Sequence, residues 1–221
     1  MVIYLSHYLN SNTPSYGSRH IFDISKKSSI CCGDTANDSY ISSTVHIGTH
    51  IDMPYHFHEN GQTIKNYKPD FWFFNNILVV EIEPKDYVIE NELVDKLDSV
   101  KRNDIDFLIV ITGLGKDRHN KRYTTENYGF HSNLAPFLRK KFPDLRLFGF
   151  DSISVSSFQD RMEGRKAHRA FLNPDNPILL MEDMDLSQLR DGIQITSVIV
   201  APMLIEDCDG LPCTIIGELS V

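Results

Sequence analysis

Short apolar runs alternate along the chain with segments in which apolar residues recur every three or four positions. Apolar runs of roughly four to eight residues, rich in β-branched and aromatic side chains, are typical of buried strands. This pattern predicts strands at residues 77–82, 107–112, 146–150, 178–182, 195–203 and 213–219. The three-to-four-residue spacing predicts helices at residues 90–100, 131–141 and 164–172.

Alternating strands and helices of this kind predict an α/β fold with a mixed, partly parallel sheet. The chain shows no internal repeat, no low-complexity tract and no long linker, so residues 1–221 are expected to form one domain. One polar stretch, residues 115–129, interrupts the pattern. We expect it to be a surface loop near the functional site or a contact with another subunit.

The segment 46–57 (HIGTHIDMPYHF) is the most informative part of the chain. It places three imidazoles and one carboxylate at even-numbered positions: His46, His50, Asp52 and His56. Because alternate side chains of a strand point the same way, an extended backbone would line up all four groups on one face, with a gap at Gly48. Imidazole and carboxylate together are ligands for zinc, manganese or iron. The segment therefore predicts a metal site.

A helix is the alternative for this segment, because His46 and His50 are four residues apart, as in helical zinc motifs. The β-branched residues around them favour a strand, Gly48 would weaken a helix and Pro54 would end one. A single histidine is more often a hydrogen-bonded core or surface residue than a ligand. Four potential ligands within eleven residues favour metal binding.

Composition and charge narrow the choice of partners. A 221-residue chain that is 41% hydrophobic and 24% charged is typical of a globular protein. Its formal charge of −8 provides no basic surface for nucleic acid, and no apolar run reaches the length that spans a membrane. No signal peptide is recognisable, and the four cysteines form no C-x-x-C pair: Cys31, Cys32, Cys208 and Cys213. Reduced thiols in a cytoplasmic protein are expected.

The string HIGTHIDMPYH resembles the signature H-x-G-T-H-x-D-x-P-x-H of the cyclase family, which includes bacterial kynurenine formamidases and isatin hydrolases. Further blocks of the chain resemble that family in the expected order: Leu5-Ser6-His7 with Thr13-Pro14, Gly33-Asp34 with Asn37, residues 149–154, Ala167-His168, residues 179–182, residues 201–203 and residues 209–212. The resemblance implies a swivelling β/β/α cyclase-like fold with its metal site at the end of the sheet.

The resemblance also implies roles for particular residues. A first ion would be held by three residues of the signature: His46, His50 and Asp52. Asp52 would bridge to a second ion that is also held by His168 and Glu182. His56 matches the histidine that acts as general acid and base in the family. Because some members hold a single metal, one or two divalent ions per chain are expected, with zinc as the first choice and manganese as the alternative.

Without the resemblance, the roles of two of these residues as metal ligands remain undecided. His168 lies in a basic helical stretch (GRKAHRAF), where an exposed or structural histidine is the ordinary expectation. Glu182 ends an apolar run that should be a buried strand, where a carboxylate is unfavourable unless it is paired or bound to metal. Residues 182–185 could instead form a solvated acidic turn.

The function expected from these features is hydrolysis of an amide-type C–N bond in a small molecule by metal-activated water, with His56 protonating the leaving nitrogen. An arylformamide resembling N-formylkynurenine is the expected substrate. A lactam or lactone hydrolase, a cyclase or dehydratase, and a metal-binding module without catalysis remain alternatives. The resemblance also implies a homodimer or homotetramer.

Three features remain open at this point. The aromatic residues at 71–74 could form a pocket wall, but they fit a core or a dimer contact better. His58 could be a spare acid or base, although a surface histidine is the ordinary expectation. Family members often carry a basic residue shortly after the proline at position 212, and here Cys213 and Thr214 follow. A substrate carboxylate contact at that place is therefore in doubt.

Overall fold

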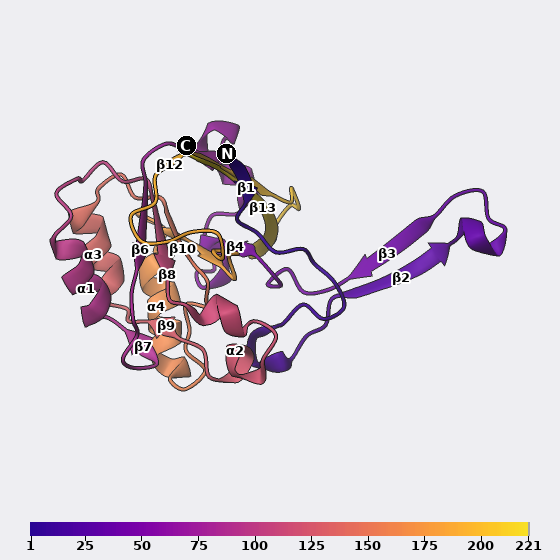
Figure 1. Ribbon diagram of the computed structural model, residues 1–221, viewed down its shortest axis with the longest axis horizontal. Helices are drawn as coiled ribbons and strands as arrows, with labels where there is room; N and C mark the ends of the chain where they lie inside the picture. The colour runs from indigo at the N-terminus through magenta and orange to yellow at the C-terminus, as the bar shows by residue number, and fades with distance from the viewer. Residues whose placement is uncertain (221) are drawn as a thin grey trace.

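The computed structural model of this chain describes residues 1–220, and a nine-stranded mixed sheet forms its centre (Figure 1). Eight strands follow one another across the sheet in the order β5 (Phe73–Phe74), β12 (Ile195–Pro202), β13 (Gly210–Leu219), β4 (His50–Asp52), β11 (Leu179–Glu182), β10 (Leu147–Phe150), β8 (Phe107–Ile111) and β6 (Ile77–Glu81). Strand β1 (Val2–Tyr4) pairs with β13. All six strands predicted from apolar runs are present, with ends shifted by at most a few residues.

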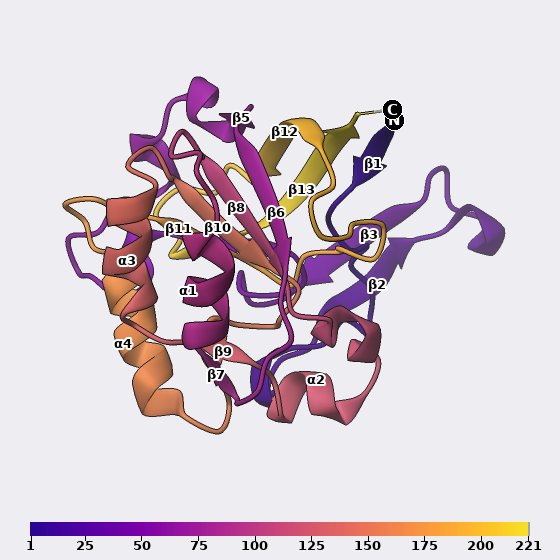
Figure 2. The ribbon, with the colours of Figure 1, turned by 60° about the vertical axis from the view of Figure 1, so that its left-hand side comes forward.

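The sheet has a parallel half, with β6, β8, β10 and β11, and an antiparallel half, with β12 and β13 (Figure 2). The two halves meet at β4. Strands β6, β8, β10 and β11 are parallel to one another. They are continuous apolar runs because both of their faces are covered, as is usual in parallel sheets. Strand β4 pairs antiparallel with β11 on one side and with β13 on the other. The predicted α/β class with a mixed, partly parallel sheet is confirmed.

Three helices lie together beside the parallel half: α1 (Asn91–Asp98), α3 (Leu134–Lys141) and α4 (Arg161–Phe171) (Figures 1 and 2). They correspond to the three predicted helices. Helix α4 begins three residues earlier than predicted, because the Asp160 side chain accepts a hydrogen bond of 2.9 Å from the Glu163 amide and caps the helix. Within residues 1–220 no helix combines the length and the apolar character needed to cross a membrane.

The polar stretch at 115–129 is more ordered than predicted. It contains most of the 3-10 turn η6 (Leu114–Asp117) and the short helix α2 (Lys121–Thr125). Arg118 and Tyr123 are buried, and both donate hydrogen bonds to the Asp183 carboxylate. The segment lacks apolar periodicity because polar contacts hold it against the body. The prediction of a surface loop is wrong for the turn, the helix and the buried residues, and a contact with another subunit stays a prediction.

A long β-hairpin projects from the body, and no feature of the apolar pattern predicted it (Figure 1). We call residues 23–42 the hairpin arm. It consists of β2 (Asp23–Ser28), the 3-10 turn η2 (Ile30–Cys32) and β3 (Asp38–Ser42). Every residue of the two strands is exposed except Ser28, which is half-buried. A strand pair without a buried face has no reason to alternate apolar and polar residues, so its sequence resembles a loop.

The remaining elements are short. They are the 3-10 turns η1 (Tyr16–Ser18), η3 (Pro54–His56), η4 (Ile64–Asn66) and η5 (Pro69–Trp72) and the parallel pair β7 (Val88–Ile89) and β9 (Gly129–Phe130). Of these, η1 and η3 contribute side chains to the site described next.

Candidate metal centre

Strand β4 places two potential ligands at the centre of the sheet. Its residues His50 and Asp52 share one face, whereas Ile51 points to the other face and is fully buried in the core. Glu182 on β11 is the cross-strand partner of His50, so the two side chains lie on the same face. His50 Nε2 is 3.4 Å from Glu182 Oε2 and 3.4 Å from Asp52 Oδ1.

The backbone bends away from the strand on both sides of β4. Gly48 has a φ of 59°, a backbone conformation that residues other than glycine rarely adopt, and Pro54 begins the turn η3. His46 therefore approaches the centre from a bend and His56 from a 3-10 turn. The prediction that all four groups lie on the face of one strand is correct for the pair on β4 and wrong for these two histidines. The bends still bring all four side chains together.

His168 reaches the same place from α4, where it is 5% exposed. Its Nε2 lies 3.3 Å from Asp52 Oδ2 and 3.8 Å from Glu182 Oε1. The ring of Phe57 stacks on this imidazole with the centroids 4.4 Å apart. Glu182 and Asp183 are 3% and 1% exposed, so the alternative of a solvated acidic turn is wrong.

The two buried histidines are oriented as metal ligands usually are. His50 Nδ1 lies 2.8 Å from the Gly48 carbonyl oxygen, and because a carbonyl only accepts, this nitrogen carries the proton. His168 Nδ1 lies in the same way 2.8 Å from the Gly164 carbonyl oxygen. Nε2 of each ring is left to face the Asp52 carboxylate. Within residues 1–220, His50 Nε2 and Asp52 Oδ2 are buried without a hydrogen-bond partner, which is unusual for polar atoms. These donors fit a divalent metal ion.

The carboxylates of the centre change the pKa values of its imidazoles. Burial alone would lower the pKa of His50, but the negative charges of the neighbouring Asp52 and Glu182 carboxylates raise it well above the usual value. Burial opposes the shift at His46 as well, and there the Asp52 charge and the Asp209 hydrogen bond raise the pKa to about 9. A cation must displace the protons that these nitrogens hold, so the centre binds metal more weakly as the pH falls.

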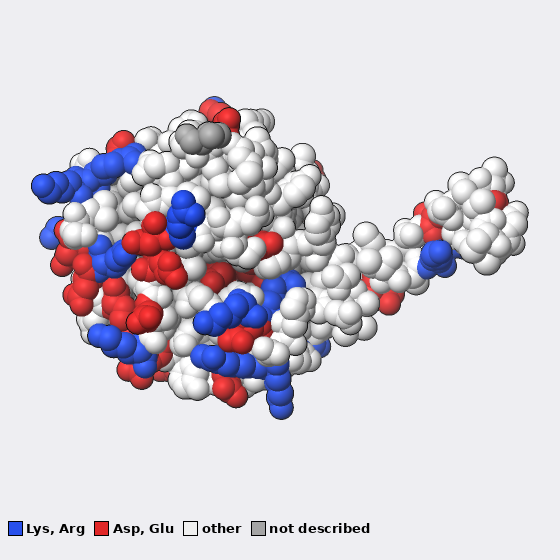
Figure 3. Space-filling model, in the orientation of Figure 1, with Lys and Arg blue, Asp and Glu red and all other residues white. Residues whose placement is uncertain are grey.

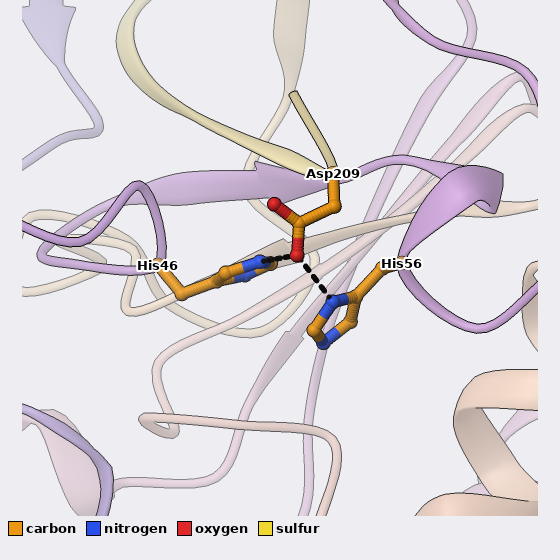
Figure 4. Close-up of side chains that lie close together, drawn as sticks. All are labelled: His46, His56 and Asp209. Carbon is orange, nitrogen blue, oxygen red and sulfur yellow. Dashed lines mark hydrogen bonds and ion pairs between the residues drawn. The ribbon is translucent and has the colours of Figure 1, made fainter. Parts of the chain in front are cut away.

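Asp209 was not foreseen as a site residue. Its Oδ2 lies 2.8 Å from His46 Nε2 and 2.8 Å from His56 Nδ1, so it joins the two histidines that flank β4 (Figure 4). The other nitrogen of His46, Nδ1, lies 2.9 Å from Asp52 Oδ1. His46 is thus hydrogen-bonded to a carboxylate on each side. A cation held by His46 would take the place of one of these bonds.

A local signal for Asp209 exists in the sequence. Gly210 opens β13 directly after it, and a Cβ at this glycine would clash with the ring of His46. A glycine at the start of a strand can mark a close approach of backbone to another group, and its requirement here is visible only in the structure. The sequence does not say which group approaches, since Asp209 and His46 are far apart along the chain.

The centre lines a cavity of about 330 Å³, within the range of small-molecule sites. Tyr16 and Phe57 provide aromatic surface in it. The aromatic residues at 71–74 lie outside the cavity, and Trp72 and Phe74 are buried in the core, as the core interpretation predicted. His58 lies outside the centre as well, with Nε2 3.1 Å from the Arg169 carbonyl oxygen.

The cysteines take no part in this site. Cys31 and Cys32 are exposed at the tip of the hairpin arm, Cys208 is half-buried and Cys213 is buried. All four are free thiols, in agreement with the expected reduced cysteines.

The comparisons with known proteins agree with this geometry. Residues 3–157 match a family model described as "Putative cyclase". A kynurenine formamidase of Bacillus cereus is 26% identical over 179 residues, which cover 80% of this chain and 78% of that protein. Cyclase-like protein 3 of rice (Oryza sativa subsp. japonica) is 25% identical over 220 residues, which cover 96% and 77%.

Solved structures show the same architecture. Isatin hydrolase A from Labrenzia aggregata superimposes with a TM-score of 0.80 at 17% identity, covering 100% of this chain and 94% of that chain. This likeness confirms the cyclase-like fold that the signature predicted. The family model covers well over half of the sequence, from the first strand to the loop that follows β10. The chain therefore belongs to the cyclase family.

Proposed function

We propose that the chain is a metal-dependent hydrolase that cleaves an amide-type C–N bond of a small molecule. The observation that carries the proposal is the arrangement of two buried imidazoles around one buried carboxylate at a cavity of small-molecule size. The relative named kynurenine formamidase supports an arylformamide as the substrate class. An N-formylkynurenine-like compound is the first choice within this class.

The two oxygens of Asp52 face different histidines, which supports two ions rather than one. Oδ1 lies 3.4 Å from His50 Nε2, and Oδ2 lies 3.3 Å from His168 Nε2. A carboxylate arranged in this way can bridge two cations. Imidazole and carboxylate ligands suit zinc, which we take as the resident ion, and manganese is the alternative.

A bound divalent cation would supply an activated water and would polarise the substrate carbonyl. His56 would move the proton: water adds to the carbonyl carbon, the C–N bond breaks, and the proton released by water passes through His56 to the leaving nitrogen. Asp209 accepts the hydrogen bond from His56 Nδ1, which orients the ring and leaves its Nε2 to exchange protons. The products are an acid and an amine.

Metal content and turnover together test this function. Protein purified without chelator or polyhistidine tag should contain close to two zinc ions per chain and should release formate from N-formylkynurenine or a simpler arylformamide. Chelation should abolish turnover and zinc should restore it. Turnover that persists after complete metal removal contradicts the proposal. Two ions without turnover of formamides, lactams or lactones would favour a binding module.

We further propose that the chain associates with a second copy through the hairpin arm. An isolated two-stranded hairpin is only marginally stable in water. The arm nevertheless exposes Ile24 and Ile41, which are cross-strand partners, at 47% and 60%. Both also line a second cavity of about 420 Å³ at the root of the arm, beside Tyr4 and Phe22. Figure 3 shows a few charged side chains on the arm among mostly uncharged ones, and the two exposed isoleucines suit an apolar partner surface.

Light scattering tests this association. The wild type should be a dimer or tetramer at micromolar concentration, and Ile24→Asp with Ile41→Asp should be monomeric because each charge would be buried in the interface. Gln188→Glu with Gln194→Glu adds the same charge at exposed positions of the body and should leave the oligomer intact. A monomeric wild type, or a double arm variant that stays oligomeric, contradicts the proposal.

A further inference from the structure

The face of α4 that carries His168 also carries two arginines. Arg161, Arg165 and His168 follow one another at intervals of four and three residues, and residues at such intervals lie on one side of a helix. An α-helix rises about 1.5 Å per residue, so Arg165 and Arg161 stand about 5 Å and about 10 Å along the axis from His168. All three residues line the cavity of the metal centre. The helix therefore places two guanidinium groups at the cavity, one nearer to His168 and one farther from it along the helix axis.

A third arginine reaches the same cavity from a different part of the chain. Arg19 directly follows the turn η1, and its side chain is among those that line the cavity. The carboxylates among the lining residues are Asp52 and Glu182, which both belong to the metal centre. Outside the metal centre, the charged side chains of the cavity wall are thus arginines, in a chain whose acidic residues outnumber its basic ones by 30 to 22.

The three arginines lack carboxylate partners. Within residues 1–220, none of Arg19, Arg161 and Arg165 forms an ion pair, whereas the buried Arg118 pairs with Asp183 at 2.6 Å. In a protein with an excess of acidic side chains, arginines are readily neutralised by neighbours. Three unpaired guanidinium groups at one cavity indicate that their charge is available to a ligand.

The contacts of the two α4 arginines leave most of their N–H groups free. The Arg161 guanidinium lies over the ring of Phe158, 5.7 Å from its centroid, which engages a face of the group rather than its donors. Arg165 Nη1 lies 3.3 Å from Met162 Sδ, and a thioether is a weak acceptor. Such contacts hold the side chains in place without using the donors that recognise an anion.

The segment that follows Pro212 provides no basic group at this cavity. Cys213, which follows Pro212, is buried and lines the second cavity instead of the cavity of the metal centre. Any recognition of a negatively charged substrate therefore has to come from another part of the wall. The α4 arginines and Arg19 are in a position to provide it.

We infer that Arg161 and Arg165, with Arg19 from the other segment, bind a carboxylate of the substrate. This inference rests on the proposed hydrolase function, because the carboxylate is defined by its distance from the bond that is cleaved. The substrate class is a planar amide whose carboxylate lies roughly 5–10 Å from the scissile carbonyl, matching the rise between His168 and the two arginines. Tyr16 and Phe57 provide the aromatic surface for the group between them.

A matched pair of substrates tests this inference on the zinc-loaded enzyme. 4-Formamidobenzoate and formanilide share the same formamide and ring, and only the former carries a carboxylate. The wild type should prefer 4-formamidobenzoate in kcat/KM. Arg165→Gln should reduce this preference about tenfold to a hundredfold, mainly through KM, because a charge-assisted hydrogen bond is lost. Arg165→Lys should restore part of it. An unchanged preference in Arg161→Gln with Arg165→Gln overturns the inference.

Arg169→Gln is the control for these variants. Arg169 is exposed on the same helix, one residue beyond His168, and it does not line the cavity. Its replacement removes the same charge from α4 and should leave the substrate preference unchanged. A loss of preference in this control as large as that in Arg165→Gln would show a general charge effect and would also overturn the inference.

Binding of 4-aminobenzoate, measured by calorimetry, separates this inference from the hydrolase function. Binding that weakens about tenfold or more in Arg161→Gln with Arg165→Gln supports the arginine site even if the enzyme hydrolyses no formamide. Binding that disappears in His50→Ala but persists in the arginine variant would assign the carboxylate to the metal and overturn the inference. If 4-aminobenzoate does not bind to the wild type, the assignment of a carboxylate is overturned. The same holds if phenyl phosphate binds at least tenfold more tightly than benzoate, measured in the same way.

Discussion

Asp52→Asn should leave the protein with little or no bound metal and reduce hydrolysis by about a thousandfold or more. Asp52 is 1% exposed, and its carboxylate lies within 3.4 Å of a ring nitrogen of each of His46, His50 and His168. An amide in its place keeps the shape but offers one neutral oxygen in place of two charged ones. Metal analysis measures the first effect and single-turnover kinetics the second. The loss of rate is this large because the variant would lack the metal that activates water and polarises the substrate carbonyl.

Asp106→Asn separates this effect from a loss of stability. Asp106 is also buried, at 9% exposure, and accepts hydrogen bonds from the Asn75 and Asn76 amides far from the centre. This variant should melt at a lower temperature and keep its full metal content. If Asp52→Asn binds as much metal as the wild type, the central role given to Asp52 is wrong.

His56→Ala should retain both ions and lose about a hundredfold to ten-thousandfold in kcat, the usual contribution of a general acid and base. His56 is half-buried beside the centre, and its Nδ1 is bonded to Asp209 rather than to a buried ligand. Asp209→Asn should have a smaller effect on kcat in the same direction, since it disturbs only the orientation of the ring. Metal analysis and steady-state kinetics on the same preparations provide both readouts.

His58→Ala is the matched control, because it removes an imidazole two residues away that bonds the Arg169 carbonyl outside the centre. It should leave kcat within about twofold. His56 also lies near Asp52 and His168, close enough to hold a cation with them. Loss of one ion in His56→Ala would make this residue a ligand, and full activity would remove it from the reaction altogether.

The elements that could be predicted are those whose burial produces a pattern of apolar residues in the sequence. Strands β8 and β10 are fully buried, and their continuous apolar residues identify them without any contact information. His50 and Asp52 follow the two-residue period of a strand, so their shared face could be predicted as well. The hairpin arm has no buried face, so its strands show no such apolar pattern.

The parts of the site that were missed depend on contacts between distant segments. Asp209 approaches His46 and His56 because β13 pairs with β4, and this pairing cannot be derived from local periodicity. The α4 arginines share the helical spacing of His168, which is visible in the sequence. The sequence does not show that this face of α4 borders the metal centre, so a role of the arginines at the site could not be predicted.

The meeting of the two sheet halves at β4 has a mechanical consequence. Asp52 and His168 are more than one hundred residues apart in the chain, and they face each other across 3.3 Å. An ion held by both would act as a cross-link that closes this long loop, much as a disulfide does, and restricting a loop of such length disfavours the unfolded chain. In this architecture the same ion that serves the reaction would also fasten α4 to the middle of the sheet, so metal supply would set the lifetime of the protein as well as its activity.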